Sequence, residues 1–199
     1  MANPLLLPAV PRLPSAPEAY ERQYGDQFNS ALRLYFNQLN NFNAGLANEI
    51  WYYGTFFDTT GQTPAATNTA YSITFTATDI SNGVVIGTPA SRIVVPESGL
   101  YQFNCVCQIS SGDASKKDMR VWFRKNGTDL ANSARIVTSD ISGGYATLTL
   151  LQPVSLAADD YVEVVFAADS TNISLAAVAS TAYAPAAPAV LLEVTQVQQ

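Results

Sequence analysis

From Trp51 onward the chain alternates apolar and polar residues with a period of two, and this pattern restricts the fold more than any other feature. Residues two apart in a strand point to the same side of a sheet, so the alternation indicates strands with one buried face. The apolar residues that we expect on buried faces are Tyr71, Ile73, Phe75, Tyr101, Phe103, Cys105, Cys107, Ile109, Met119, Val121, Phe123, Ala146, Leu148, Leu150, Val162, Val164, Phe166, Val190, Leu192 and Val194.

Short turn-forming pairs separate the alternating segments. These pairs are Asn82-Gly83, Ser98-Gly99, Gly112-Asp113, Asn126-Gly127 and Gly143-Gly144. Asn, Asp and Gly tolerate the backbone angles of tight turns, so the pairs favour antiparallel connections. Over residues 50–199 we therefore predict an all-β antiparallel sandwich of about eight to ten strands, of the jelly-roll type, which forms a knob.

The first 16 residues have no pattern of a helix or an inner strand. Prolines recur at positions 4, 8, 11, 14 and 17, and proline fixes φ and lacks an amide hydrogen. Between them lie apolar side chains that a short extended segment cannot bury on itself: Leu5, Leu6, Leu7, Val10 and Leu13. We predict that residues 1–16 form an extended anchoring arm that docks through these side chains on another protein.

Residues 17–46 have the pattern of a single helix. Ser15 and Glu18 are spaced as in a capping box, with Pro17 tolerated in the first turn, although Gly25 favours a later regular start near Asp26. An apolar seam with heptad spacing consists of Phe28, Leu32, Tyr35, Leu39 and Phe42. A helix this short is marginal in water, so its seam needs a partner. The seam either packs on its own domain or joins identical subunits; we predict the second, a coiled-coil-type trimerisation stalk.

Several strands also carry large apolar residues on the side that the alternation assigns to solvent. These residues are Trp122, Tyr145, Tyr161 and Val165. A recurrent set of this kind indicates a second buried surface. Either loops of the same chain cover these residues, or other subunits do. We predict the second, with the four residues at the subunit interface of the knob.

The chain is poor in charge. Charged residues make up 13% of the sequence, and the net charge is −6 with the basic residues scattered, so we do not expect nucleic-acid binding. The sequence shows neither a membrane span nor a secretory signal peptide, so we expect no membrane insertion. Cys105 and Cys107 are two apart on one strand, which is poor geometry for a mutual disulfide, and we expect buried free thiols.

Catalytic motifs are missing from the sequence. It contains no histidine, which excludes His-based triads and proton shuttles, and no glycine-rich phosphate loop. Asp160 and Glu163 are three apart and tend to opposite faces of a strand, which favours solvated turn charges over the paired carboxylates of a glycosidase. We predict no enzymatic activity, no cofactor and no metal site; calcium binding in the loops stays open.

Three segments of the β-rich region resemble the jelly rolls of complement globular heads and tumour necrosis factor. They are Ser91–Phe103, which ends in Gly-Leu-Tyr-Gln-Phe; Val121–Gly127, with an Asn-Gly hairpin; and Leu156–Val164, which has Asp159 where this family usually has glycine. The resemblance covers roughly residues 50–197. It implies a homotrimer of ten-stranded jelly rolls whose apolar outer faces meet at the threefold axis.

The N-terminal segment resembles the leaders of tailed-bacteriophage virion proteins. Its matching residues are Leu13-Pro14, Tyr20, Tyr24 and the run Leu34-Tyr35-Phe36-Asn37-Gln38-Leu39. The resemblance implies a structural virion protein, either a short trimeric fibre or knob or a capsid decoration. Such a protein assembles in the bacterial cytoplasm and docks at the virion surface on a capsid, portal/collar or tail protein. The alternative is a host receptor-binding adhesin at a tail-fibre tip, which recognises a glycan or a surface protein.

Overall fold

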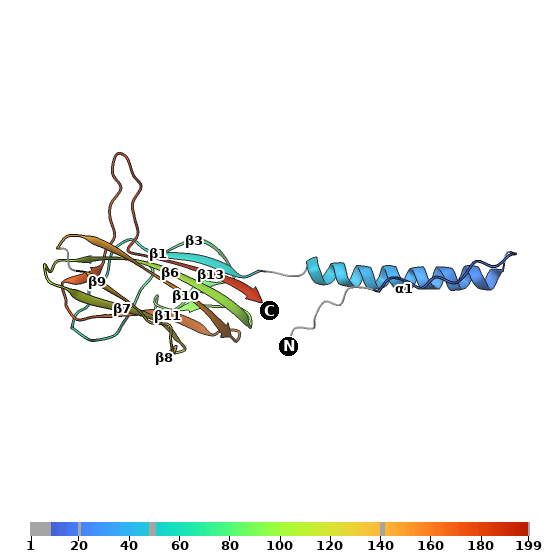
Figure 1. Cartoon of the computed structure of the whole chain (residues 1–199), viewed down its shortest axis with the longest axis horizontal. Helices are drawn as coiled ribbons and strands as arrows, with labels where there is room; N and C mark the ends of the chain where they lie inside the picture. Colours follow the sequence, from blue (N-terminus) through green and yellow to red (C-terminus); the bar gives the residue numbers. More distant parts are fainter. Residues whose placement is uncertain (1–8, 20, 48–50, 140–141, 199) are drawn as a thin grey trace. The chain divides into compact units, whose positions relative to one another are not determined.

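The computed structural model describes residues 9–19, 21–47, 51–139 and 142–198. The chain divides into two compact units, Met1–Ile50 and Trp51–Gln199. The first unit contains one helix, and the second is built of two antiparallel sheets (Figure 1). The prediction of an antiparallel β-sandwich preceded by a helix is therefore confirmed at this level.

The helix α1 (Arg22–Ala47) begins five residues later than the predicted boundary at residue 17. Residues 9–19 form neither helix nor strand. The reason lies in the spacing of Pro11, Pro14 and Pro17, which equals the three-residue repeat of a polyproline II segment. Proline also disfavours helical angles in the residue before it. Pro17 therefore belongs to the extended arm and does not open the helix.

Sheet A has the strand order β10-β6-β13-β1-β3, and β12 pairs with the end of β6 that β13 leaves free. Every pairing is antiparallel. Its strands are β1 (Tyr53–Asp58), β3 (Ala77–Asn82), β6 (Gly99–Ser111), β10 (Tyr145–Leu156), β12 (Ile173–Leu175) and β13 (Val190–Gln198). The strand that comes last in chain order, β13, thus lies in the middle of the sheet.

Sheet B has the strand order β4-β5-β11-β7-β8, with β2 beside β11 and β9 beside β7. Its pairings are also antiparallel. Its strands are β2 (Tyr71–Ser72), β4 (Val85–Ile86), β5 (Ile93–Val94), β7 (Lys117–Lys125), β8 (Thr128–Asp129), β9 (Arg135–Ser139) and β11 (Tyr161–Ala168). The described residues hold more strands than predicted because four of them are only two residues long, too short to show alternation.

The core lies between the two sheets. All the predicted inward residues are buried except Tyr71 and Ala146, which are half-buried. The rings of Phe103 on β6 and Phe123 on β7 lie 5.9 Å apart and join the two sheets. Cys105 and Cys107 are free and buried, with their Sγ atoms 3.8 Å apart, as predicted. The hydrogen bond between the two thiols and their burial raise the pKa of Cys105.

The connections use the predicted turn chemistry. Asn126 and Gly127 have φ angles of 47° and 81° and form the two-residue turn between β7 and β8. Asp159, in the place where the resembled family has glycine, has a φ of 65°. The turn before β11 therefore keeps the left-handed conformation that glycine would adopt more easily.

Replacing Asp159 with glycine should raise the free energy of unfolding by about 0.5–1 kcal/mol, because glycine has no Cβ to strain at this φ. Urea denaturation of the two proteins measures the difference. Asp159→Val is the matched control and should be less stable than wild type, since a β-branched residue fits this angle worst. Equal stability of all three proteins would contradict the strained turn.

The connection between β12 and β13 rises from the sandwich as a narrow hairpin, drawn in dark red in Figure 1. Val178 and Ala187 exchange two backbone hydrogen bonds of 2.9 Å at its base. Near its tip, Tyr183 is 91% exposed. The hairpin is thus a protruding element with a single aromatic side chain near its end.

Candidate functional site

The two sheets differ sharply in charge. The three long strands β6, β10 and β13 of sheet A contain one charged residue, Glu193. On sheet B, the nine-residue strand β7 alone contains five charged residues: Lys117, Asp118, Arg120, Arg124 and Lys125. Because charged residues are depleted at the centre of protein interfaces, the outer face of sheet A is the stronger candidate for a contact with another chain.

Apolar side chains gather on that outer face. Val106 on β6 pairs with Leu191 on β13, and the register of β13 with β1 sets Phe57 opposite Leu191. All three are half-buried within the single chain. Tyr145 and Leu151 on β10 extend the patch and are 60% and 59% exposed. We call these five residues (Phe57, Val106, Tyr145, Leu151 and Leu191) the sheet A patch.

The four residues predicted for the knob interface do not share one surface. Tyr145 belongs to the sheet A patch, whereas Trp122, Tyr161 and Val165 lie on sheet B. Val165 is fully buried within one chain, so the prediction that it contacts another subunit is wrong. Val165 pairs with Ser72 on one side and with Trp122 on the other. Its burial agrees with the alternative explanation, in which segments of the same chain cover it.

Trp122 and Tyr161 are half-buried and have partners within the chain. The Arg92 guanidinium lies over the ring of Tyr161, 4.2 Å from its centroid. The indole Nε1 of Trp122 donates a 2.8 Å hydrogen bond to Asp129 Oδ1. Arg124 Nε donates to the same oxygen at 2.8 Å. These two hydrogen bonds, of which the one from Trp122 has the larger effect, hold the pKa of Asp129 below its ordinary value.

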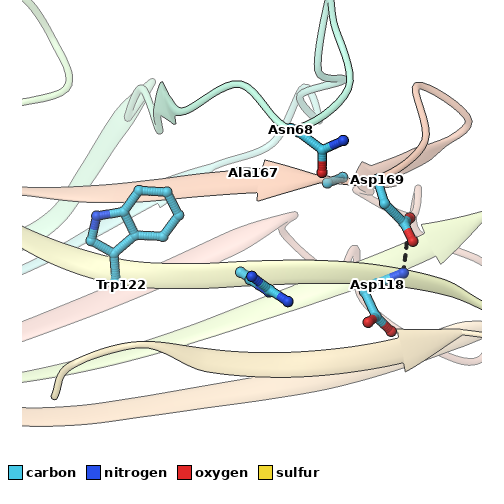
Figure 2. Close-up of a pocket in the computed structure, with 7 residues that line it drawn as sticks. Asn68, Asp118, Trp122, Ala167 and Asp169 are labelled. Carbon is cyan, nitrogen blue, oxygen red and sulfur yellow. Dashed lines mark hydrogen bonds between the residues drawn. The ribbon is translucent and has the colours of Figure 1, made fainter.

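A pocket of about 310 Å³ lies beside Trp122 on sheet B. Its lining comes from β7, from the end of β11 and from the segment before β2: Asn68, Asp118, Arg120, Trp122, Ala167, Ala168 and Asp169. In Figure 2, Trp122 stands at one end of this pocket and the Asp118 and Asp169 carboxylates at the other. Sequence reasoning missed it, although Asp118, Arg120 and Trp122 alternate along one face of a strand and could have indicated it.

The carboxylates considered as a paired site have structural partners. Glu163 is buried, contrary to the prediction of a solvated charge, and accepts a 2.7 Å hydrogen bond from the Ser91 hydroxyl. Asp160 accepts hydrogen bonds from the Ala157 amide at 2.8 Å, Lys125 Nζ at 2.9 Å and Asn126 Nδ2 at 2.6 Å. Asp160 therefore links the turn after β7 to the turn before β11.

We expect these contacts to make the stability of the knob depend on pH in the acid range. The Ala157 amide, followed by Lys125 and Asn126, lowers the pKa of Asp160 to about 2 from its ordinary 3.8. The stabilisation is full above pH 3.8 and is lost as the pH falls through 2. Because solvent screens this carboxylate, we expect a contribution of about 1 kcal/mol.

The check compares wild type with Asp160→Asn by urea denaturation between pH 6 and pH 2. The gap in free energy of unfolding should narrow as the pH falls toward 2, because protonation removes the charge from the wild-type side chain as well. A gap that stays constant over this range would contradict the assigned role of the charge.

The first unit has an apolar helix seam and a partly exposed arm. Phe28, Leu32, Tyr35, Leu39 and Phe42 are half-buried, so the seam is not sealed within one chain. On the same helix, Leu34 is 61% and Phe36 54% exposed. Of the predicted docking residues, Val10 is 86% and Leu13 47% exposed, while Leu5, Leu6 and Leu7 lie outside the described residues.

No protein-family model matches the chain, and no curated protein matches it either. Within the described ranges, no helix has the length and apolar character needed to cross a membrane. The same residues contain no group of three or more Cys, Asp or Glu side chains placed to hold a metal ion. The site assignments therefore rest on the geometry above.

Proposed function

We propose that this chain is a structural virion protein of a tailed bacteriophage, a short trimeric fibre or knob or a capsid decoration. Its arm docks on another virion protein of the capsid, portal/collar or tail. Its helix joins three subunits, and its sandwich forms the knob at the virion surface after assembly in the bacterial cytoplasm. The observation that carries the proposal is a first unit with a proline-spaced arm and an unsealed apolar helix, in a chain whose second unit is a sandwich with one charge-poor face.

The strand pairing supports a jelly roll for the knob. When β2, β3, β4, β8 and β12 are left aside, eight strands remain, numbered here one to eight along the chain: β1, β5, β6, β7, β9, β10, β11 and β13. In these numbers the sheets have the orders 1-8-3-6 and 2-7-4-5. The chain thus crosses from sheet to sheet at nearly every step, which is the connectivity of two Greek keys wound into a jelly roll.

The sheet A patch and the helix seam support a homotrimer. Both are apolar, and both stay partly exposed in one chain. A threefold arrangement that brings the outer face of sheet A together would bury Tyr145 and Leu151 and would leave the charged strand β7 of sheet B toward solvent. Glu193 lies on the same face of β13, two residues from Leu191 and in one row with Asn104 and Leu151, so such a contact must leave its carboxylate hydrated or paired.

The arm supports docking on a second protein. Pro11, Pro14 and Pro17 are half-buried, whereas Val10 and Leu13, each directly before a proline, are exposed. An extended segment of this kind loses little conformational freedom when it binds, because proline already restricts the free chain. It also offers apolar side chains at regular intervals to a groove on its partner.

Deletion of residues 2–14 from the protein in the phage tests the proposal. The shortened chain should fold and assemble as a trimer but be lost from purified particles, as measured by mass spectrometry of virions. Val10→Asp with Leu13→Asp is a matched variant that keeps the chain length and should also weaken incorporation. A normal copy number of either variant in particles would overturn the role of the arm as anchor. Electron microscopy of labelled wild-type particles would show whether the protein is attached to the capsid, the collar or the tail.

A further inference from the structure

The pocket on sheet B has the composition of a carbohydrate site. It combines one aromatic ring, two carboxylates, one amide and one guanidinium around a volume of about 310 Å³. That volume lies at the lower end of the range for small-molecule sites. A ligand with one apolar face and a rim of hydroxyl groups would meet both kinds of side chain.

The aromatic wall is held in place before any ligand binds. The hydrogen bond from Trp122 Nε1 to Asp129 fixes the edge of the indole, and Arg124 fixes Asp129 in turn. Trp122 is half-buried, so part of its ring stays open to solvent. A rigid indole offers a large contact area at little entropic cost when a flat apolar surface stacks on it.

The acidic end of the pocket is also ordered. The Asp118 amide donates to Asp169 Oδ1 at 3.0 Å, the Asp169 amide donates to the Asp118 carbonyl at 3.1 Å, and Thr138 Oγ1 donates to Asp118 Oδ1 at 2.7 Å. Within the described part of the chain, the Oδ2 atoms of Asp118 and Asp169 accept no hydrogen bond. Two fixed carboxylates therefore keep an acceptor atom each for a ligand.

Two donors complete the rim. The backbone N–H of Asn68 donates to the Ala168 carbonyl at 2.7 Å. Residue 68 has a φ of 54°, which asparagine adopts more readily than most residues. Neither the Asn68 side chain nor the Arg120 guanidinium has a hydrogen-bond or ion-pair partner among the residues that the structure describes. The pocket thus presents unused acceptors and unused donors around one aromatic wall.

We propose that this pocket binds a neutral pyranose sugar unit of a surface glycan. The apolar face of the sugar stacks on Trp122, and its hydroxyl groups donate to Asp118 and Asp169 and accept from Arg120 and Asn68. The two carboxylates and the single guanidinium give the pocket a net negative charge, and this charge disfavours acidic sugars. The inference does not rest on the proposed virion role, although three copies in one trimer would strengthen weak binding by multivalency.

The full-length protein is tested on immobilised glycans in three arms: neutral sugars (galactose, glucose, mannose and N-acetylglucosamine), acidic sugars (sialic and glucuronic acid) and the cationic sugar glucosamine. Retention on at least one neutral sugar, above the acidic and cationic arms, is the expected result. Retention on none of the neutral sugars, or stronger retention on an acidic sugar or glucosamine, would overturn the proposal.

Variants then assign the binding to the pocket. The chain has two tryptophans, so in Trp51→Phe the emission of Trp122 alone reports titration with the neutral sugar that binds. Trp122→Ala should weaken binding at least tenfold and Trp122→Phe less, while Arg120→Ala and Asn68→Gly should weaken it severalfold. Trp51→Ala, the matched control outside the pocket, should bind as wild type does.

Circular dichroism checks that each variant is folded. If Trp122→Ala fails to fold, the binding measured with Arg120→Ala and Asn68→Gly decides whether the pocket is the site. Both variants should fold, because the Arg120 side chain is exposed and glycine readily adopts the φ of residue 68. Unchanged affinity in the folded pocket variants would overturn the site. Trimer mass and particle incorporation are measured separately, so failure of the sugar site leaves the proposed virion role standing, and the reverse also holds.

Discussion

Replacing Phe166 with alanine is expected to lower the free energy of unfolding of the knob by about 3–5 kcal/mol. Phe166 lies on β11, in the interior of sheet B, and is 2% exposed. Its ring centroid lies 5.9 Å from that of Tyr71 on β2. Alanine would leave a cavity at the junction of β11 and the two-residue strand β2, which has few contacts of its own to hold it. Many domains are stable by only about 5–15 kcal/mol, so this variant approaches the limit of folding.

Chemical denaturation of the two proteins measures the loss. Phe166→Leu is the matched control, because it keeps most of the buried volume and should cost clearly less than alanine. A loss below about 1 kcal/mol for Phe166→Ala would show that this part of the core collapses around the smaller side chain.

Replacing Leu191 with glutamate is expected to abolish formation of the proposed trimer while the knob stays folded. Leu191 lies on the central strand β13 of sheet A, opposite Val106 of β6 on one side and Phe57 of β1 on the other, so it occupies the middle of the sheet A patch. Burying a leucine contributes roughly 1.5–3 kcal/mol, and burying an unpaired carboxylate costs several kcal/mol more. In the proposed trimer, threefold symmetry would repeat this penalty at every subunit.

Multi-angle light scattering distinguishes the outcomes, since the chain mass is 21.3 kDa and a trimer has three times that mass. Ile136→Glu is the matched control, because Ile136 lies on β9 of sheet B and is 57% exposed in the single chain. A folded Leu191→Glu protein that keeps the trimer mass would show that subunits meet elsewhere. A wild-type protein with the mass of one chain would contradict the trimer itself.

The alternation along the long strands was enough to predict the core. In β6, for example, the residues at alternate positions from Tyr101 to Ile109 are all fully buried, because a strand with one face against another sheet has no other arrangement for its apolar side chains. The same rule could not find β2, β4, β5 or β8, because two residues are too few to show alternation. Two of these strands, β2 and β5, also owe their place in the sheet to β11, which lies far along the chain.

What covers an outer face cannot be derived from alternation. The alternation along β11 assigns Val165 to the outer side of sheet B, yet Val165 is fully buried. Its exposure depends on which distant segments of the chain cross that side. The neighbouring Glu163 shows the same effect, since Ser91, 72 residues away, supplies its hydrogen bond. The polar pocket likewise joins three segments that only the folded chain brings together. Such pairings are set by tertiary packing, which local patterns do not encode.

The position of β13 also determines when the knob can fold. This strand is made after all the others, yet it separates β6 from β1 in the middle of sheet A. While the ribosome is still synthesising it, each of those two strands has an unpaired edge that can join the edge of a neighbouring nascent chain. Folding of sheet A must therefore wait until β13 has emerged, and a nonsense mutation upstream of Val190 would release a chain with a gap at the centre of the sheet.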